Sequence, residues 1–345
     1  MIVSSMALAS VFWLQAQTIA PAELRQALQN PEAQLTTQWL QQADDQQFIE
    51  QLRTQLEQQH SPIAREWLLQ QVIQRLQTMP PSSEAKRFLQ PLTDYQSTYA
   101  LSQDFEGRER AVPMTHIASQ ARLTLQWYAV RERAAELPTT ISLEQLSAEW
   151  SQMNVVDQRA WLYRVEHEQH LPSWQLNPSS RTLLTEQAPA LAMALAKRHQ
   201  DTELVAALLQ RSADAELVRF AQTLDEWLPT QILLNLSKPL PEKSIHRTVL
   251  YAQLARSGDV NALQFIQQKS LAGDDGALYA LVQAQPQQAK NLLQKWFASG
   301  DAGQQKRAVF GMRLINNSDS EHTLKVWAKQ QGLATSVQKE LAPWQ

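Results

Sequence analysis

Cysteine is absent from this chain of 345 residues, and glycine occurs only eight times. Without cysteine the protein has no disulfide, no cysteine-ligated metal, no thiol nucleophile and no cysteine for lipid attachment. A chain of average composition and this length would carry roughly three times as many glycines. Folds rich in β-structure need glycine in turns and bulges, whereas the abundant Gln, Leu and Ala are good helix formers. The composition therefore predicts an all-α protein.

An excess of positive charge is also lacking. The chain has 31 Lys and Arg against 34 Asp and Glu, a formal net charge of −3, and no run of basic residues. Nucleic-acid binding requires clustered cations, so we expect no nucleic-acid partner. Glycine-rich phosphate loops and the Gly-x-Ser-x-Gly motif of serine hydrolases are missing too. We therefore expect no cofactor and favour a protein without catalytic activity, although the sequence leaves this open.

Charged side chains are missing from residues 1–22, within which an apolar run covers residues 6–14. This run is too short to span a bilayer but has the length of a signal-peptide core, although no basic residue precedes it. Ala20-Pro21-Ala22 fits the cleavage pattern, and cleavage after Ala16 is an alternative. We expect a signal peptide or hydrophobic segment over residues 1–22 and a periplasmic or secreted bacterial protein. An uncleaved membrane-proximal anchor, or a buried first helix in a cytoplasmic protein, are the alternatives.

Apolar residues recur at helical spacing after Pro21, a residue that suits the first turn of a helix. Residues 23–89 are therefore predicted to be an N-terminal helical region. Its apolar stripes are Leu35, Trp39, Phe48, Leu52, Leu56, Ile63, Trp67, Leu68, Val72, Ile73 and Leu76. Residues 90–115 lack this periodicity and contain Pro91, Gly107 and Pro113. We predict an irregular linker there, disordered or with an extended segment, before a helical-repeat domain over residues 116–345.

Three similar tripeptides punctuate the last third of the chain: Ser257-Gly258-Asp259, Ala272-Gly273-Asp274 and Ser299-Gly300-Asp301. Glycine takes the left-handed conformation that ends a helix. An aspartate directly after it caps the first turn of the next helix. The tripeptides therefore predict short antiparallel helices joined by tight turns, and helix capping also explains the paired carboxylates Asp44-Asp45 and Asp274-Asp275.

A weak repeat accompanies these turns. Leu250-Tyr251-Ala252 recurs as Leu278-Tyr279-Ala280 after 28 residues, and Val309-Phe310-Gly311 follows after another 31. A drifting period near 30 is typical of degenerate helical repeats. Residues 181–342 thereby resemble the HEAT-like α-solenoid proteins, although the regular Asp-x-x-Val-Arg signature of that family is missing. The resemblance implies a right-handed α-solenoid, a superhelix of antiparallel helix pairs with a concave groove, and implies nothing about chemistry.

The best candidate for a metal site is the segment Glu166-His167-Glu168-Gln169-His170. On a helix, His167, His170 and Glu166 share one face, and imidazole and carboxylate are zinc ligands. The spacing is one residue shorter than in the His-Glu-x-x-His motif, and the polar end of a helix is the simpler interpretation. The other histidines occur singly among polar residues and are predicted to be solvated: His60, His116, His199, His246 and His322.

These observations favour a non-enzymatic helical-repeat scaffold that binds a protein or peptide partner in the bacterial cell envelope. The candidate binding residues are aromatic side chains that the core does not require: Trp127, Tyr128, Trp174 and Trp344. The alternative is an envelope hydrolase that acts on cell-wall glycan or peptide, with His167 and His170 as metal ligands. The sequence leaves the identity of the partner and the oligomeric state open.

Overall fold

The computed structural model describes residues 16–168, 171–172 and 174–344. The apolar core of the predicted signal peptide lies outside these residues. Within them the chain forms twenty α-helices and one three-stranded sheet, so the protein is predominantly helical, as its composition predicts. None of the described helices combines the length and apolarity that a bilayer span requires.

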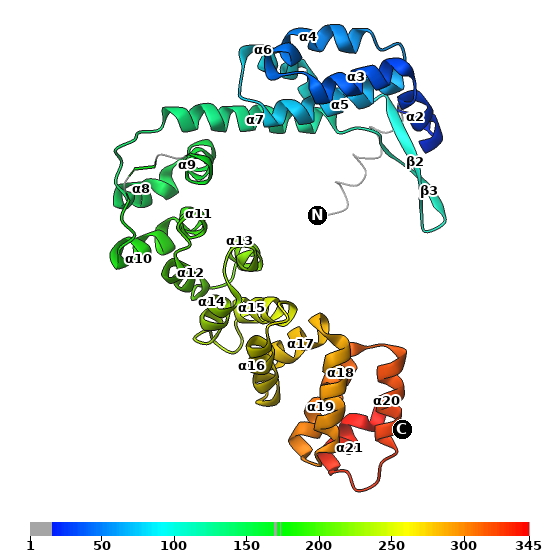
Figure 1. Ribbon diagram of the computed structural model, residues 1–345, viewed down its shortest axis with the longest axis vertical. Coiled ribbons are helices and arrows are strands. Elements are labelled where there is room, and N and C mark those ends of the chain that lie inside the picture. The colour runs from blue at the N-terminus through cyan, green and yellow to red at the C-terminus, as the bar shows by residue number, and fades with distance from the viewer. Residues whose placement is uncertain (1–15, 169–170, 173, 345) are drawn as a thin grey trace, which may run out of the picture. The chain divides into compact units, whose positions relative to one another are not determined.

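The chain divides into two compact units (Figure 1). Unit 1 comprises the described residues of Met1–Pro138 together with Asn154–Arg164, and unit 2 comprises those of Thr139–Met153 and Val165–Gln345. The long helix at residues 117–136, which we assigned to the repeat domain, thus belongs to unit 1.

Unit 1 is a small helical bundle with a β-hairpin. Its helices are α2 (Pro21–Leu28), α3 (Pro31–Gln42), α4 (Asp45–Glu57), α5 (Pro62–Thr78), α6 (Ser83–Leu89), α7 (Ile117–Glu136) and the 3₁₀-helix η2 (Gln90–Asp94). Seven of the eleven residues in the predicted apolar stripes are buried in its core, Trp39, Ile63 and Trp67 are partly buried, and Leu35 is 66% exposed, so its assignment to the core face was wrong. Asn30, Asp44, Ser61 and Ser82 accept hydrogen bonds from first-turn N–H groups and so fix where α3 to α6 begin.

The segment predicted to be an irregular linker contains the extended structure that was one of the two alternatives, but residues 99–113 are paired strands and not an irregular chain. They form the hairpin strands β2 (Tyr99–Phe105) and β3 (Arg108–Pro113). A third strand, β1 (Gln17–Ile19), pairs in parallel with residues 99–101, which gives the order β1-β2-β3. Ile19 is 1% exposed, so the residues just before Pro21 belong to the fold.

Unit 2 consists of short helices joined by tight turns. They are α8 (Leu143–Glu149), α10 (Pro178–Gln187), α11 (Pro189–His199), α12 (Thr202–Leu209), α13 (Ala215–Gln222), α14 (Thr230–Ser237), α15 (Ile245–Arg256), α16 (Val260–Leu271), α17 (Asp275–Ala284), α18 (Pro286–Ala298), α19 (Ala302–Ile315), α20 (Ser318–Ala328) and α21 (Thr335–Leu341). Short 3₁₀-helices lie at η3 (Trp150–Gln152), η4 (Leu224–Glu226) and η5 (Ala342–Trp344), and α9 (Val155–His167) contributes residues to both units.

The three glycine-aspartate turns predicted from the sequence are confirmed. Gly258, Gly273 and Gly300 have φ values of 71°, 104° and 78°. The aspartate after each glycine caps the next helix, because Asp259, Asp274 and Asp301 accept hydrogen bonds from the backbone N–H groups of Ala262, Ala277 and Gln304. These turns place α16, α17 and α19.

Helices of unit 2 pack closely on their neighbours in the sequence and on the next helix but one. Helix α15, for example, contacts α13, α14, α16 and α17, and α19 contacts α17, α18, α20 and α21. Each apolar face is therefore covered by helices that follow or precede it at short range.

Arginine side chains recur at the C-terminal ends of earlier helices, where carbonyl groups have no partner within the helix. In unit 1, Arg75 of α5 donates to the carbonyls of Leu40 and Ala43 at the end of α3. Arg131 of α7 donates to those of Gln77 and Met79 at the end of α5, at 3.0 and 2.6 Å. Arg164 of α9 donates to those of Leu137 and Pro138 after α7, at 2.9 and 3.1 Å.

Arginine side chains make the same kind of contact in unit 2. Arg198 of α11 donates to the carbonyls of Val165 and Glu168 around the end of α9. Arg307 of α19 donates to those of Ser270 and Asp274 around the turn that follows α16, at 3.1 and 3.0 Å. A guanidinium group suits these positions because it carries several donors and a positive charge that the helix dipole favours.

Candidate functional site

The most unusual feature of the described chain is the β2–β3 hairpin, which projects from the helices of unit 1 (Figure 1). One buried carboxylate holds its base. Glu66 of α5 is 3% exposed and accepts hydrogen bonds from the Thr98 N–H (2.9 Å) and from the hydroxyls of Thr115 (2.9 Å), Tyr95 (3.2 Å) and Ser97. Four donors offset the loss of solvent around the charge. Both ends of the hairpin are thereby tied to one helix.

Burial raises the pKa of Tyr95 to about 12, and the negative charge of Glu66 adds to the shift. The Tyr95 hydroxyl therefore keeps its proton, and can donate to Glu66, throughout the neutral range.

Strand β3 forms one edge of the sheet, and its backbone orientation follows from the register. The Met114 N–H donates to the Tyr99 carbonyl at 3.1 Å, so residues 99 and 114 are a hydrogen-bonded pair. Hydrogen-bonded and non-hydrogen-bonded pairs alternate along an antiparallel ladder. The pairs Asp104–Glu109 and Ser102–Ala111 are then non-hydrogen-bonded. The N–H and C=O groups of Glu109 and Ala111 consequently point away from β2, toward the open edge.

The outer half of the hairpin is exposed on every side. Residues 103–111 are all exposed, and the turn residues Glu106 and Gly107 have φ values of 54° and 77°. Positive φ at both positions is typical of the tight two-residue turn that matches the twist of the strands. The Gly107 N–H also donates to the Asp104 carboxylate at 2.8 Å. The outer half is thus an ordered two-stranded ribbon, which we call the hairpin arm (residues 102–111).

The two faces of the hairpin arm differ in charge, because directly paired residues share a face. One face carries the pairs Phe105–Arg108 and Gln103–Arg110, and the other carries Asp104–Glu109. The first face therefore has two cations beside an aromatic ring that is 48% exposed, with the Arg110 guanidinium carbon 5.9 Å from the ring centroid. The second face has two carboxylates directly opposite each other, which is unfavourable.

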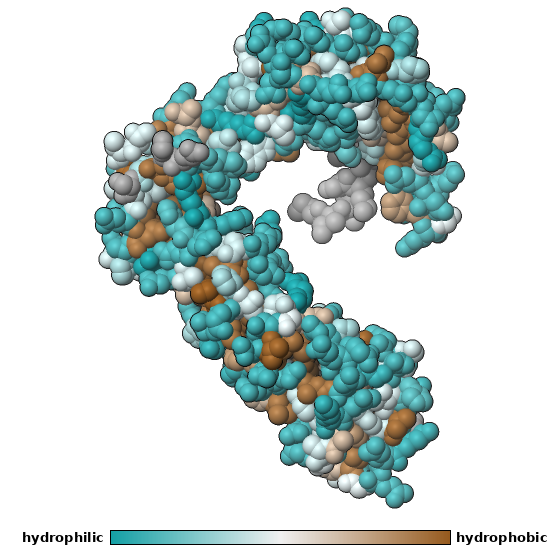
Figure 2. All heavy atoms as spheres, in the orientation of Figure 1, coloured by the Kyte–Doolittle hydropathy of each residue, from teal (hydrophilic) through white to brown (hydrophobic). Residues whose placement is uncertain are grey.

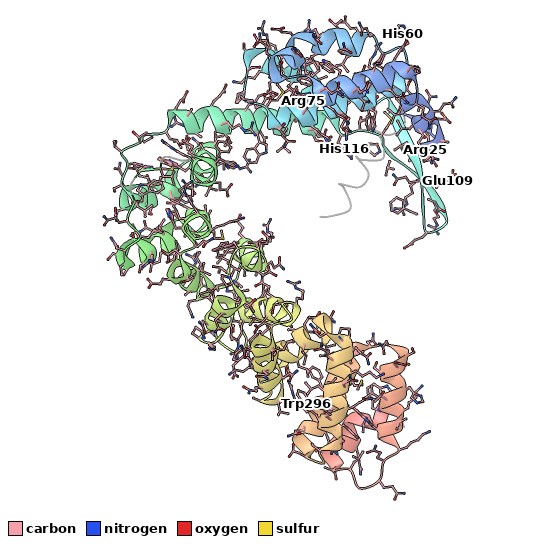
Figure 3. All side chains as sticks on the ribbon, viewed as in Figure 1. Arg25, His60, Arg75, Glu109, His116 and Trp296 are labelled. Carbon is pink, nitrogen blue, oxygen red and sulfur yellow. The ribbon has the colours of Figure 1, made fainter. Side chains whose placement is uncertain are left out.

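The charges of β3 lack ionic partners. Within the described residues, neither Arg108, Glu109 nor Arg110 forms an ion pair. In Figure 2 the outer hairpin is mainly hydrophilic, with apolar atoms near its base, and in Figure 3 Glu109 lies on the projecting strand. The arm therefore offers an open strand edge and an alternating row of uncompensated charges.

Of the aromatic residues predicted to bind a partner, Tyr128 was a wrong choice. Its side chain is fully buried in unit 1, and its hydroxyl donates to the Leu76 carbonyl at 2.6 Å. Its neighbour Trp127 on α7 is 37% exposed. Helical periodicity places adjacent residues on different faces, but the sequence alone did not indicate which of the two faced the core.

The other two candidates lie apart in unit 2 and are partly exposed. The indole ring of Trp344 lies near Arg313, whose guanidinium carbon is 5.4 Å from the ring centroid. Trp174 donates from its indole N–H to the Ile141 carbonyl at 3.0 Å. It lines a shallow depression of about 470 Å³ whose other walls are mainly polar, with Thr139, Thr140, Ser142, Glu144, Gln175 and Asn177.

The predicted metal site gains no support from the described residues. Glu166 and His167 are exposed at the end of α9, whereas His170 lies outside the described part of the chain. No group of three or more His, Asp or Glu residues that could hold a metal ion occurs among the residues with described positions. The solvated environment predicted for His246 is wrong, because this residue is fully buried and its Nδ1 lies 2.9 Å from the Leu209 carbonyl.

A buried ionic cluster in unit 2 is structural. Arg247 lies 3.1 Å from the Asp274 carboxylate, which also accepts a hydrogen bond from the Tyr251 hydroxyl at 3.2 Å. Burial raises the pKa of Tyr251 to about 12. Asp274 caps α17, and Arg247 also donates to the Leu240 carbonyl. These groups are occupied in fixing the turn before α17, so they do not resemble a catalytic centre.

Sequence reasoning missed the hairpin arm, although a signal was present. Glu106-Gly107 can form a tight turn, and it stands between two short stretches that lack helical periodicity and contain the strand-forming residues Tyr99, Phe105 and Val112. Comparison of the chain with known protein families, curated proteins and solved structures found no match.

Proposed function

We propose that this protein is a non-enzymatic helical-repeat scaffold that binds a protein or peptide partner in the bacterial cell envelope. The observation that carries the proposal is the hairpin arm, because its outer strand has an open edge and unpaired charges. An isolated two-stranded hairpin is marginally stable, and an open edge invites pairing with another chain. A partner strand beside β3 would extend the sheet and satisfy the outward backbone groups of Glu109 and Ala111.

The scaffold part of the proposal assigns unit 2 to a right-handed α-solenoid of antiparallel helix pairs, as the resemblance to HEAT-like proteins implies. It is supported by packing between helices that are near in sequence. It is further supported by the side chains that reach back to an earlier helix end, such as Arg198 over 30 to 33 residues and Arg307 over 33 to 37. A repeated short-range arrangement of this kind is what a solenoid requires.

The binding role is tested by shortening the arm without disturbing its base. Deletion of residues 102–105 and 108–111 joins Leu101 and Val112 through the native Glu106-Gly107 turn. It removes an even number of residues from each strand, so the inward and outward faces are kept. The pairing with β1 at residues 99–101 is kept as well.

A photoreactive amino acid at Ala111 should cross-link one envelope protein reproducibly in living cells, and the same amino acid at the exposed Leu271 of unit 2 serves as the control. The shortened protein should lose that partner when it is recovered under native conditions, with unchanged helical content. Recovery of the same partner by the shortened protein would rule out the arm as the binding site.

The envelope location rests on the apolar run near the N-terminus and is tested by mass spectrometry of the mature protein. If export removes this segment, we expect a mature start at Gln17 and not at Glu23. Cleavage after Ala22 would remove β1, whose Ile19 is buried, and would cut within the first turn of α2. A start at Met1 would contradict export, and one at Glu23 would contradict the role of β1.

No observation among the described residues favours the alternative of an envelope hydrolase. Its suggested metal ligand His170 lies outside the described residues, and the buried ionic cluster of unit 2 is occupied in helix capping.

A further inference from the structure

We infer that the hairpin arm recognises an extended partner segment in which an acidic, a basic and an acidic residue follow one another. This inference deepens the proposed function and rests on it. It commits to one occupant, a protein strand paired with the open edge of β3, and the argument for that occupant is charge complementarity with Arg108, Glu109 and Arg110.

Backbone pairing sets where the partner's side chains lie. A strand added to β3 must hydrogen-bond to the outward groups of Glu109 and Ala111, and it cannot receive an N–H from Pro113. Side chains directly opposite each other across two strands share a face, with Cβ atoms about 4.5–5.5 Å apart. The partner residue opposite Glu109 therefore shares its face, and the residues before and after it share the face of Arg108 and Arg110.

The charges of β3 then specify the partner. Arg108 and Arg110 stand on one face with only Phe105 and Gln103 opposite them in β2, so a cross-strand carboxylate can reach them only from the other side of β3. Acidic residues in the partner supply it. On the other face, Glu109 stands opposite Asp104, and the two carboxylates repel each other. A basic partner residue opposite Glu109, between the two acidic partner residues, would attract Glu109 and offset this repulsion. The required order, acidic-basic-acidic, reads the same in both directions and suits a parallel or an antiparallel strand.

Other occupants fit less well. An anionic membrane or a nucleic acid would attract the arginine face but would repel Glu109 and Asp104 on the opposite face of the same ribbon. A second copy of β3 in an antiparallel pair must place outward residues opposite outward residues, so Glu109 would stand opposite Glu109 and Arg108 opposite Arg110, or Arg110 would stand opposite Arg110. An unrelated partner with the full complementary triplet satisfies all three charges.

The inference is tested with two peptides whose three charged residues have opposite signs at every position, so that their net charges also differ in sign. Acetylated and amidated Thr-Val-Glu-Lys-Glu-Val-Thr is compared with Thr-Val-Lys-Glu-Lys-Val-Thr, each with the same neutral fluorophore, by titration with the full chain at low salt. We expect the first peptide to bind about tenfold more tightly, because three attractive pairs replace three repulsive ones. The preference should shrink as salt is added.

Reversal of the strand's own charges provides the decisive variant. The substitutions Arg108→Glu, Glu109→Lys and Arg110→Glu should invert the preference between the two peptides. A control with the same total change in charge uses Lys238→Glu, Glu242→Lys and Lys243→Glu in the exposed turn between α14 and α15, and should keep the original preference. The circular dichroism of both variants should match that of the native protein.

Equal binding of the two peptides, binding of neither at millimolar concentration, or an unaltered preference in the reversed variant would each overturn the inference. Two further results would overturn the inference if no preference between the peptides is seen. One is binding of the protein to phosphatidylglycerol vesicles, and the other is dimerisation through β3, in each case abolished by the triple charge reversal. The proposed function is tested independently of this charge pattern. It is wrong if the protein with the shortened arm still binds the cross-linked partner when it is recovered under native conditions. If shortening removes that partner but charge reversal does not, only the charge rule is wrong.

Discussion

At the scale of single residues, buried polar side chains in this protein hold together segments that are distant in the sequence. Glu66 shows this best, because its two carboxylate oxygens together accept four hydrogen bonds from residues on both sides of the hairpin. Without such partners a buried carboxylate would be strongly unfavourable. This role could not be predicted from the sequence, because Glu66 stands within a helix like many exposed glutamates, and its partners are 29 to 49 residues away.

Glu66→Ala should lower the free energy of unfolding by about 2–4 kcal/mol, because it leaves several buried donors without an acceptor. Glu66→Gln keeps one acceptor oxygen and should cost about half as much. Hydrogen exchange at the Thr98 amide, together with urea unfolding, checks both values. The exposed Glu57→Ala is the control, with an expected change within about 0.5 kcal/mol. Unchanged protection at Thr98 in Glu66→Ala would contradict the assigned role.

Tyr128 predicts an alkaline dependence of stability. Burial raises its pKa to about 12, against an ordinary value of about 10. Between these values the unfolded chain loses the proton while the folded chain keeps it, so the contribution to stability is complete below pH 10 and is lost as pH rises toward 12. Tyr128→Phe removes this dependence and also the hydrogen bond to the Leu76 carbonyl.

At pH 8 this variant should therefore be less stable than the native protein by about 1 kcal/mol. At pH 11.5 this difference in the free energy of unfolding should have disappeared or reversed in sign, because the raised pKa then lowers the stability of the native protein by more than about 1 kcal/mol. Denaturant unfolding of both proteins at the two pH values measures this difference. The other tyrosines are present in both proteins, so their titration cancels in the comparison. A difference that is the same at both values would show that the Tyr128 hydroxyl titrates equally in the folded and unfolded states.

At the scale of elements, helix ends decide the arrangement. Caps and glycine turns could be predicted because they depend on adjacent residues, and Gly258, Gly273 and Gly300 with their aspartates are as expected. The arginines that reach earlier helix ends could not, because the sequence does not show which helix end faces which side chain. The hairpin at residues 99–113 was missed for a related reason: its strands depend on Glu66 and β1, which are distant in the sequence.

Arg307 allows a test of the arginine contacts. It donates to the carbonyls of Ser270 and Asp274 and also pairs with Asp275. Arg307→Lys keeps the charge, but the single ammonium group of lysine cannot donate to both carbonyls as the planar guanidinium does. The free energy of unfolding of unit 2 should therefore fall by about 1–2 kcal/mol. The amides of Gly273 and Asp274, which close the end of α16, should exchange faster. The adjacent exposed Lys306→Ala should leave them unchanged, and equal exchange in both variants would argue that Arg307 is dispensable.

At the scale of the whole molecule, the composition was enough to predict a predominantly helical chain. Its binding surface was not predictable in the same way. The aromatic candidates Trp127, Tyr128, Trp174 and Trp344 were chosen for residue type, yet Tyr128 belongs to the core, and the other three are exposed to different degrees. Residue type indicates what a side chain can do, whereas exposure depends on contacts that only the fold provides. The charge pattern of β3 gains meaning only after its strand register and open edge are known.

Unit 2 should tolerate loss of its last helices, because α20 and α21 pack closely only on α19, on each other and on η5, apart from contacts such as the Phe297–Trp327 ring stack. A chain that ends at Asn316 exposes Phe297, and a version with Phe297→Gln keeps the new end soluble. Hydrogen exchange should show unchanged protection in α10 to α17 and reduced protection in α18 and α19, since each helix depends on its neighbours alone. If protection were lost from α10 onward as well, unit 2 would be one cooperative globule, and the assignment to a helical-repeat scaffold would have to be abandoned.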